Sequence, residues 1–408
     1  MAGLHARLSA SSASRWMHCP GSQVRVDMLA SLGVEDDETE YSAEGSCAHE
    51  GASEALINGY EPWLLIGEKL YTDSNGKEWE FTAEMAEHVT MYTTHIRERY
   101  SDGVEMIVEE RLEDPELGAD VGGTLDCAVY QLKDNGGFVH VFDFKYGIGV
   151  SVPVGEEDEY GTRMTNTQLK YYLYLLLRKL GVSPEDDVSV GATIVQPRDK
   201  IGNPIREAWA SSKEIFAWAN TELLPAMKRT SEPGAELKPG DWCQFCPAKL
   251  LCPTMKGMFA GAAQADPLEI PEMTNERLGL EYELIDPVKK YIRAIEDECY
   301  RRALAGDPVP GSQLEKGRAD RQWKQEVELP DGRKVDVESF LRETLGGKAY
   351  TEPSLKSPAQ IEKEVGGKEL VARAAFKPEP RPILKPIRPG REAVKPNFGG
   401  GVFAGVQP

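Results

Sequence analysis

The sequence predicts an α/β protein with a mixed central β-sheet flanked by helices. Helix, several strands, helix and strand follow one another over the first 260 or so residues, the order typical of such a core. The clearest strand is an apolar run, rich in β-branched and aromatic residues, at 139–144; the clearest helix, at 168–180, is stopped by Gly181. The chain has 408 residues, which suffices for one large core or two ordinary ones.

The other elements can be assigned in chain order. Serines ahead of Arg15 are good helix N-caps, so a short helix is expected there, with Cys19 near its end and just before Pro20. The remaining predicted elements are helices over 42–58 and 82–100, strands over 105–112, 122–130 and 139–147, an irregular stretch over 153–167, a helix over 168–180, strands over 188–196 and 208–211, helices over 213–229 and 274–305, and a small hairpin around the turn at 330–332.

Two acidic residues and a lysine are predicted to meet near the end of the strand at 139–147. Because side chains alternate along a strand, Asp143 and Lys145 point to the same side. Asp126 lies on the preceding strand, and the Asn135-Gly136-Gly137 turn signal separates the two strands. A hairpin would therefore bring Asp126 beside Asp143.

These residue types indicate metal-dependent phosphodiester hydrolysis. Two carboxylates form a hard oxygen ligand set suited to Mg²⁺ or Mn²⁺, and an adjacent lysine can hold a water molecule or offset charge on a phosphate. Gln168 and Tyr172 lie four residues apart on the next helix, so both can reach the same cleft. On the strand at 105–112, Glu109 or Glu110 either points toward this site or is an acidic residue that faces solvent.

Seven cysteines in a reducing compartment point to metal ligation before disulfides. Cys243, Cys246 and Cys252 have the spacing C-x2-C-x5-C, which can grip one metal centre from a tight turn, and Cys19 is the natural fourth ligand. The other three cysteines, which are Cys47, Cys127 and Cys299, follow no such pattern and are interpreted as core thiols.

Taken together, the motifs resemble the RecB-like branch of the PD-(D/E)xK nucleases. They are, in order over residues 9–255, S-x2-R-W-x2-C-P, E-G-x3-H, G-x2-D, D-x-K, Q-x3-Y and C-x2-C-x5-C. The four cysteines look like the [4Fe-4S] clamp of AddB-type and CRISPR-associated exonucleases, and structural Zn²⁺ on the same thiolates is the alternative. The whole chain, including Trp323, is also similar to a largely uncharacterised family common in phages and prophages.

The resemblance implies a role for each matching residue. His49, Asp126, Asp143 and the backbone carbonyl of Phe144 would bind the metal ion, and Lys145 would position the attacking water. Gln168 and Tyr172 would orient the DNA. The implied function is a metal-dependent DNA exonuclease or related nuclease of phage replication or recombination, with DNA and possible phage recombination or replication proteins as partners. The alternative is an iron-sulfur DNA-binding or assembly subunit with a vestigial nuclease site.

Composition limits the other possibilities. A net charge of -20 argues against a basic nucleic-acid coat protein but not against a nuclease, in which only the groove needs to be basic. The sequence contains neither the phosphate loop of a nucleotide-dependent motor nor the G-x-S-x-G motif of a serine hydrolase. The N-terminus lacks the apolar core of a signal peptide and no apolar run has the length of a membrane span, so we expect a cytoplasmic protein, in the host if phage-encoded.

Three regions are expected. Residues 1–262 form the nuclease core with its cysteine clamp, and residues 263–350 form an extension of helices and a β-hairpin. The hairpin's basic residues around an aromatic are either a surface for a nucleic-acid strand or an ordinary solvated face; they are Lys316, Arg318, Arg321 and Lys324, with Trp323. Residues 351–408, which from Ala375 are rich in Pro and Gly and basic, are expected to be a largely disordered tail.

Overall fold

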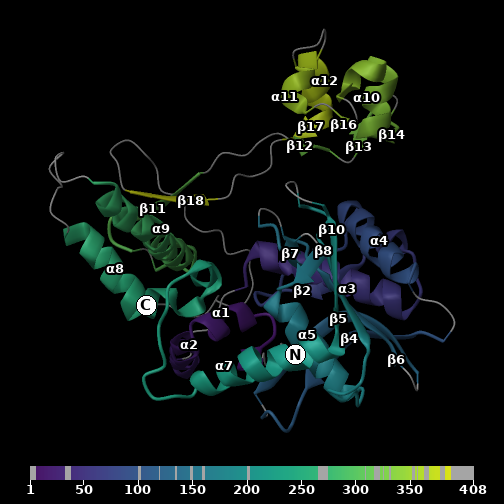
Figure 1. Cartoon of the computed structure of the whole chain (residues 1–408). Coiled ribbons are helices and arrows are strands. Elements are labelled where there is room, and N and C mark those ends of the chain that lie inside the picture. The colour runs from purple at the N-terminus through teal and green to yellow at the C-terminus, as the bar shows by residue number, and fades with distance from the viewer. Residues whose placement is uncertain are drawn as a thin grey trace. The chain divides into compact units, whose positions relative to one another are not determined.

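The structure is a computed structural model of the chain, and its elements are drawn in Figure 1. It describes residues 6–32, 38–99, 103–118, 120–133, 136–147, 150–158, 161–199, 203–264, 274–307, 309–316, 322–324, 326–329, 332–351, 354–355, 357–362, 367–376 and 382–386. The chain divides into two compact units, residues 1–291 and 292–408. Each unit has a hydrophobic core of its own.

A mixed β-sheet is the centre of the first unit, as the sequence predicts. Its strands are β1 (Leu8–Ser9), β4 (Glu105–Glu113), β5 (Val121–Lys133), β6 (Gly136–Phe144), β9 (Ser189–Val195) and β10 (Ile205–Ser211). Their order is β1-β5-β6-β9-β10, and β4 also pairs with β5. The β5-β6 and β9-β10 pairs are antiparallel, whereas β6 and β9 are parallel and are connected by a helix.

Helices cover both faces of this sheet (Figure 1). Alternation along β6 sends Val141 into one core with α1 (Ala13–His18) and α5 (Thr167–Lys179). It sends Phe142 and Phe144 into the other core, with α3 (Glu40–Ile57) and α4 (Ala83–Arg97). The remaining helices of this unit and its boundary are α2 (Gly21–Ser31), α6 (Ser212–Trp218), α7 (Leu224–Arg229), α8 (Pro253–Gln264) and α9 (Asn275–Leu304).

Helix starts follow local capping chemistry. The side chains of Thr39, Thr82 and Asn166 accept hydrogen bonds from the first-turn backbone N–H groups of α3, α4 and α5. Helix α5 ends before Gly181, which has a φ of +73° and therefore allows the chain to turn away. The cap of α5 matters for function because this helix carries Gln168 and Tyr172.

Some elements of this unit are not predicted by the sequence, including the strand pair β2 (Lys69–Thr72) and β3 (Glu78–Glu80). The stretch over 153–167, expected to be irregular, contains a small hairpin of β7 (Gly155–Asp158) and β8 (Gly161–Met164). The acidic residues of β7 hid its strand character, because carboxylates are uncommon in strands. The short strand β1 was not predicted either, since two residues are too few to show a period.

The second unit contains the predicted hairpin and further structure beyond it. Strands β13 (Glu326–Glu328) and β14 (Lys334–Asp336) are antiparallel and pack with α10 (Val337–Leu345). Upstream, β11 (Ser312–Lys316) pairs instead with β18 (Pro382–Pro386), and β12 (Gln322–Trp323) pairs with β17 (Ala375–Phe376).

The two compact units divide at residue 291, whereas the three regions expected from the sequence have boundaries at 262 and 350. Beyond 350 lie the short pair β15 (Tyr350–Thr351) and β16 (Ser354–Leu355), then α11 (Pro358–Ile361) and α12 (Gly367–Ala374). Ile361 and Val371 are buried in a cluster against Trp323, so this part of the expected tail has a small core. The sequence does not predict this small core, because its few apolar residues stand among many Pro, Gly and Lys residues. Of the expected arm from Ala375 on, 377–381 and 387–408 lie outside the described residues.

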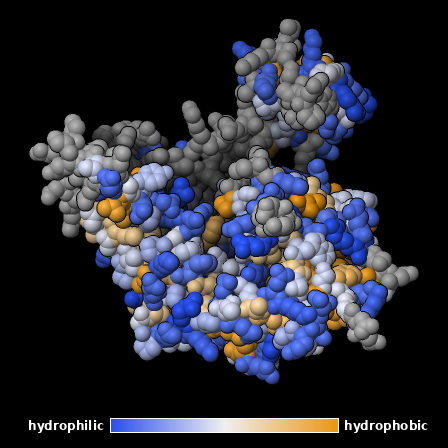
Figure 2. Space-filling view, viewed as in Figure 1, coloured by the Kyte–Doolittle hydropathy of each residue, from blue (hydrophilic) through white to orange (hydrophobic). Residues whose placement is uncertain are grey.

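The surface is mixed in character. Figure 2 shows hydrophilic residues interspersed with small apolar patches on the face in view, which is ordinary for a folded protein. Among the residues that the structure describes, no helix combines the length and the apolar character that crossing a membrane requires.

A buried histidine makes the stability of the first unit depend on pH. His140 is 1% exposed, and its Nε2 lies 2.7 Å from Thr193 Oγ1 and 3.9 Å from Glu207 Oε2. Burial lowers the pKa of His140 to about 3, below the value of about 6.5 in the unfolded chain. Between these values the unfolded chain binds more protons, so stability is lost as pH falls.

We expect the free energy of unfolding to fall by about 3 kcal/mol between pH 7 and pH 4 because of this group. Urea denaturation at several pH values would measure it. The matched variant His140→Gln removes the titrating ring, so its stability should decline less steeply over the same range. An unchanged slope in that variant would contradict the assignment.

Candidate functional site

Carboxylates from neighbouring strands lie at one level of the sheet. In the β4-β5 register, Glu109 falls opposite Asp126, between the pairs Val108-Cys127 and Glu110-Leu125. In the β5-β6 register the last pair is Cys127-Phe142, so Asp143 is the next residue opposite Asp126. The sequence prediction that a hairpin brings Asp126 beside Asp143 agrees with this register.

The sheet is irregular at this level. Glu109 has a φ of +48°, the only non-glycine residue with a positive φ among those described, and its pairing with Asp126 is interrupted. On the other side of β5, the ladder with β6 stops, and the Phe144 N–H donates to the side chain of Asp126, at 2.8 Å from Oδ2. Left-handed backbone in a glutamate and carboxylates placed opposite each other are both unfavourable. Because the strained Glu109 backbone and the opposed carboxylates lie at the same level of the sheet, we infer that this level is a candidate functional site.

His49 adds an imidazole to the carboxylates and so completes a compact set of possible metal ligands. His49, on α3, has its Nδ1 3.7 Å from Asp126 Oδ2, and its ring packs against Phe144. One donor atom each from His49, Glu109 and Asp126 lies within 4.8 Å of the others. The sequence does not decide whether Glu109 or Glu110 faces the site, because the left-handed backbone at Glu109 breaks strand alternation. In the structure Glu109 lies beside Asp126, whereas Glu110 pairs with Lys179.

Asp143, Lys145 and Gln168 form a second set of contacts beside these donors. Lys145 Nζ donates to Asp143 Oδ1 at 3.0 Å and to Gln168 Oε1 at 3.3 Å, and Gln168 Nε2 donates to Asp143 Oδ1 at 3.0 Å. Asp143 is only 3% exposed. Its Oδ2 lies 3.0 Å from Lys145 Nζ but accepts no hydrogen bond from any described residue. A buried carboxylate oxygen without a hydrogen bond is an available ligand atom.

Burial and neighbouring carboxylates raise the pKa values of Glu109 and Asp143 at this site. Burial and then the Asp126 charge raise the pKa of Glu109 to about 8, although its side chain reaches solvent. Burial also raises the pKa of Asp143, and the Lys145 ammonium only partly offsets this. Burial alone would lower the pKa of Lys145, but the charges of Asp143 and Asp126 outweigh it and raise the pKa, so the side chain is an ammonium.

Tyr172 lies near the same group. It is 5% exposed, and burial, followed by the charges of Asp126 and Asp143, raises its pKa. Its ring also borders Gly123, where a Cβ atom would lie 3.1 Å from Cε1 of the ring. The structure thus brings His49, Asp126, Asp143, Lys145, Gln168 and Tyr172 to one region, with the Phe144 backbone between Asp143 and Lys145.

The donor set fits a hard divalent cation. Carboxylate oxygens with one imidazole suit Mn²⁺ or Mg²⁺ and leave positions for water or substrate. The oxygen of Asp143 that lacks a hydrogen bond and the strained Glu109 are the observations that support this fit. A bound cation would neutralise the repulsion between Glu109 and Asp126.

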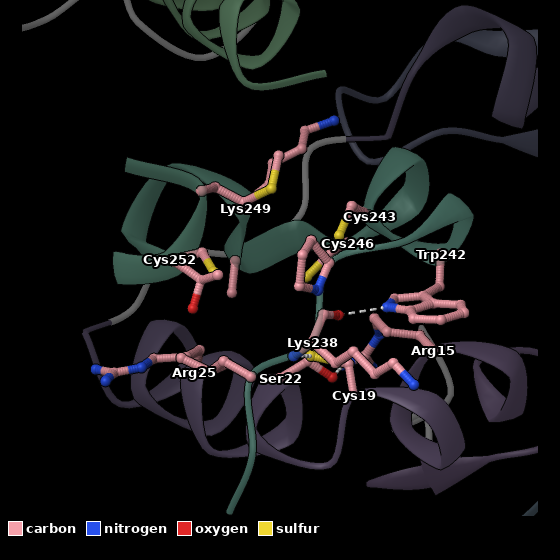
Figure 3. A pocket seen from close by; sticks show the side chains of 15 residues that line it. Arg15, Cys19, Ser22, Arg25, Lys238, Trp242, Cys243, Cys246, Lys249 and Cys252 are labelled. Carbon is pink, nitrogen blue, oxygen red and sulfur yellow. Dashed lines mark hydrogen bonds between the residues drawn. The ribbon is translucent and has the colours of Figure 1, made fainter. Parts of the chain in front are cut away.

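The four cysteines of the predicted clamp line a single cavity (Figure 3). Cys19 follows α1, and the other three come from 243–252, more than two hundred residues later. All are free thiols, and Cys243 and Cys246 are buried. The backbone N–H of Lys238 donates to Cys19 Sγ at 3.3 Å, and that of Gly240 donates to Cys243 Sγ at 3.4 Å.

In this structure the four sulfur atoms do not form a compact ligand set. No three described cysteines have sulfur atoms that all lie within 4.8 Å of one another. Four thiolates on one tetrahedral Zn²⁺ would be about 3.8 Å apart, given a Zn–S bond of about 2.3 Å. A cluster of four irons separates its thiolates more widely than one ion does. Cys47 and Cys127, in contrast, are fully buried in the other core, as the sequence predicts, whereas Cys299 is partly exposed.

Comparisons with known proteins place the chain in a family. A model of the family described as "Protein of unknown function (DUF2800)" matches residues 5–392. The chain is also similar to a crystal structure of a "Putative exonuclease" from Eubacterium rectale, at 11% sequence identity and a TM-score of 0.33, over 66% of this chain and 92% of the other.

Proposed function

We propose that this chain, which belongs to the DUF2800 family of proteins of unknown function, is a metal-dependent nuclease of the RecB-like PD-(D/E)xK type that hydrolyses phosphodiester bonds in DNA. The observation that carries the proposal is the convergence of His49, Glu109 and Asp126 beside the hydrogen-bonded group of Asp143, Lys145 and Gln168. A divalent ion and a phosphate would together supply a partner for each member of this set.

In this proposal the acidic side holds the ion. His49, Asp126, Asp143 and the Phe144 carbonyl are the ligands expected from the sequence, and Glu109 is a further one that the geometry supports. When bound, the ion would supply Lewis-acid polarisation of the phosphate and would lower the pKa of the attacking water. The ladder break between β5 and β6 leaves Asp126 free to turn its carboxylate toward this site.

Lys145 acts on the substrate side. Two of its three N–H groups donate to Asp143 and Gln168, so the third would donate to the attacking water, and its positive charge would stabilise the negative charge that develops on the phosphate in the transition state. Gln168 holds Asp143 and Lys145 in one orientation through its two hydrogen bonds, and with Tyr172 it orients the DNA. Hydrolysis forms a bond from the water oxygen to phosphorus and breaks a phosphorus–oxygen bond to the leaving nucleotide. The exonuclease mode and a place in phage replication or recombination rest on the motif resemblance alone.

We further propose that Cys19, Cys243, Cys246 and Cys252 hold an iron-sulfur cluster, with Zn²⁺ as the alternative. Their shared cavity and the two N–H donors to sulfur support this proposal. Anaerobic purification followed by an absorption spectrum would decide between them. Broad visible absorption with equal iron and sulfide supports the cluster, whereas a colourless protein containing zinc rejects it.

Degradation of labelled single- and double-stranded DNA with Mg²⁺, with Mn²⁺ and with a chelator tests the nuclease proposal. We expect cleavage only with a divalent ion, and no cleavage by Asp143→Asn, which loses the charge of a buried ligand. Measurable DNA binding without loss of substrate under any metal would overturn the proposal in favour of a DNA-binding subunit with a vestigial site.

Glu109 offers a sharper test of the ion site. Glu109→Gln should raise the dissociation constant of Mn²⁺ about tenfold, because one charged ligand is lost. It should also stabilise the metal-free chain by about 0.5 kcal/mol, because the carboxylate opposite Asp126 is removed. Calorimetric Mn²⁺ titration and urea denaturation measure the two effects. Glu110→Gln, at the adjacent residue of β4, is the matched control and should leave Mn²⁺ binding unchanged; equal binding by both variants would exclude Glu109 as a ligand.

A further inference from the structure

Arg15 is a buried cation in the wall of the cysteine cavity. It lies on α1, is 8% exposed, and lines the cavity together with the four cysteines. Its Nη1 donates to Ser22 Oγ at 3.0 Å and its Nη2 donates to Gln23 Oε1 at 3.3 Å. Both acceptors are neutral and themselves buried, so they orient the guanidinium without balancing its charge.

The nearby carboxylate of Asp27 does not pair with Arg15. Asp27 pairs with Arg7 at 2.8 Å and accepts a hydrogen bond from Gln23 Nε2 at 2.9 Å. Within the described part of the chain, Arg15 itself makes no ion pair. Arginine does not lose its proton in proteins, so burial cannot be relieved by neutralisation. A buried charge without a partner is costly, and its position indicates that an anion belongs in the cavity.

The cavity contains candidates for that anion. Cys246 and Cys19 are the groups whose charges would act most strongly on Arg15, ahead of Asp27. Backbone N–H groups donate to the sulfurs of Cys19 and Cys243, and a backbone hydrogen bond from Ala248 acts on Cys246. A metal centre held by four thiolates has a net negative charge, so a nearby cation stabilises it.

We propose that Arg15 is the internal counter-charge of the four-cysteine metal centre and a positioning residue for its retention. The inference rests on the proposed metal centre and not on nuclease activity. Of the other cations that line the cavity, Arg25 extends its guanidinium away from the sulfur atoms in Figure 3. Arg25 is therefore the matched control, since its replacement removes the same charge from the same cavity wall.

The test compares the parent chain with Arg15→Met, Arg15→Lys and Arg25→Met. Each is purified anaerobically, its iron, sulfide and zinc are measured, and metal release to excess chelator is followed. We expect Arg15→Met to release metal at least tenfold faster than the parent. Arg15→Lys, which keeps the charge, should remain within about threefold, and Arg25→Met should match the parent. If the metal is an iron-sulfur cluster, its reduction potential should become more negative in Arg15→Met only.

Several results would overturn the proposal. Release from Arg15→Met at the parent rate would show that the charge is not needed while leaving the metal centre in place. Release from Arg15→Lys as fast as from Arg15→Met would indicate a packing role. A parent chain without metal would remove the anion altogether, and DNA cleavage by that same sample would show that the nuclease proposal survives. If Arg15→Met does not fold, Arg15→Gln, which can still bond to Ser22, takes its place in the same comparison.

Discussion

Replacing Lys145 with alanine is expected to lower the rate of DNA cleavage by about 1,000-fold while the fold stays intact. Removal of one preorganised donor to transition-state charge typically costs about 100-fold to 1,000-fold. Lys145 donates to Asp143 and Gln168, and each of these residues keeps a partner in the other when the ammonium is lost. Single-turnover cleavage of labelled DNA with Mn²⁺ measures the rate, and circular dichroism with urea denaturation checks the fold.

The matched control is Lys170→Ala, because Lys170 lies over the ring of Trp218 on the side of α5 away from Asp143. It should cut DNA at close to the parent rate. Mn²⁺ affinity in Lys145→Ala should be unchanged or increased, since a competing cation near Asp143 is removed. Cleavage by purified Lys145→Ala at the parent rate would end the assignment of this site as a nuclease centre.

Replacing Cys246 with serine is expected to have the largest effect on stability. If the four cysteines hold a metal centre, part of its binding free energy, about 10 kcal/mol or more for structural zinc, is also folding free energy. Loss of one ligand should therefore lower the free energy of unfolding by several kcal/mol, on the order of 3 or more, and release the metal. Thermal denaturation and metal analysis of the purified variant measure both.

Cys299→Ser is the control, because Cys299 is partly exposed and lies outside the cavity. It should retain the parent stability to within about 0.5 kcal/mol, as surface substitutions usually do. A Cys246→Ser chain that is as stable as the Cys299→Ser chain would argue that the four thiols are ordinary core residues. DNA cleavage by Cys246→Ser at low temperature, where it is still folded, separates the metal centre from the chemistry.

The sequence allowed the centre of the sheet to be predicted, because strong local patterns agree there. Strand alternation is enough to place Asp143 and Lys145 on one side, and the turn signal between two strands is enough to place Asp126 beside them. Helix spacing likewise places Gln168 within reach of Lys145. These are local rules, and nothing in the tertiary structure opposes them.

Other features depend on information that no local pattern contains. The role of Glu109 follows from a left-handed backbone, which a glutamate gives no reason to expect. The sequence around Arg15 predicts only a short helix. That Arg15 is buried becomes evident only from the cavity, which is formed by segments far apart in the chain. The unit boundary near 291 lies within α9, whose helical periodicity runs on to Leu304; Pro287, where the sequence predicts a break or kink, lies four residues before it.

The cavity also constrains how the protein is made. Cys19 leaves the ribosome 224 residues before Cys243 (243 − 19), which at about 5–20 residues per second is an interval of roughly 10 to 45 seconds. Throughout that time its thiol and the charge of Arg15 have no partners from the later segment. If the four cysteines hold the proposed metal centre, metal delivery comes late in synthesis or after it, and cells short of iron or zinc should accumulate a newly made chain whose N-terminal helix is accessible to proteases.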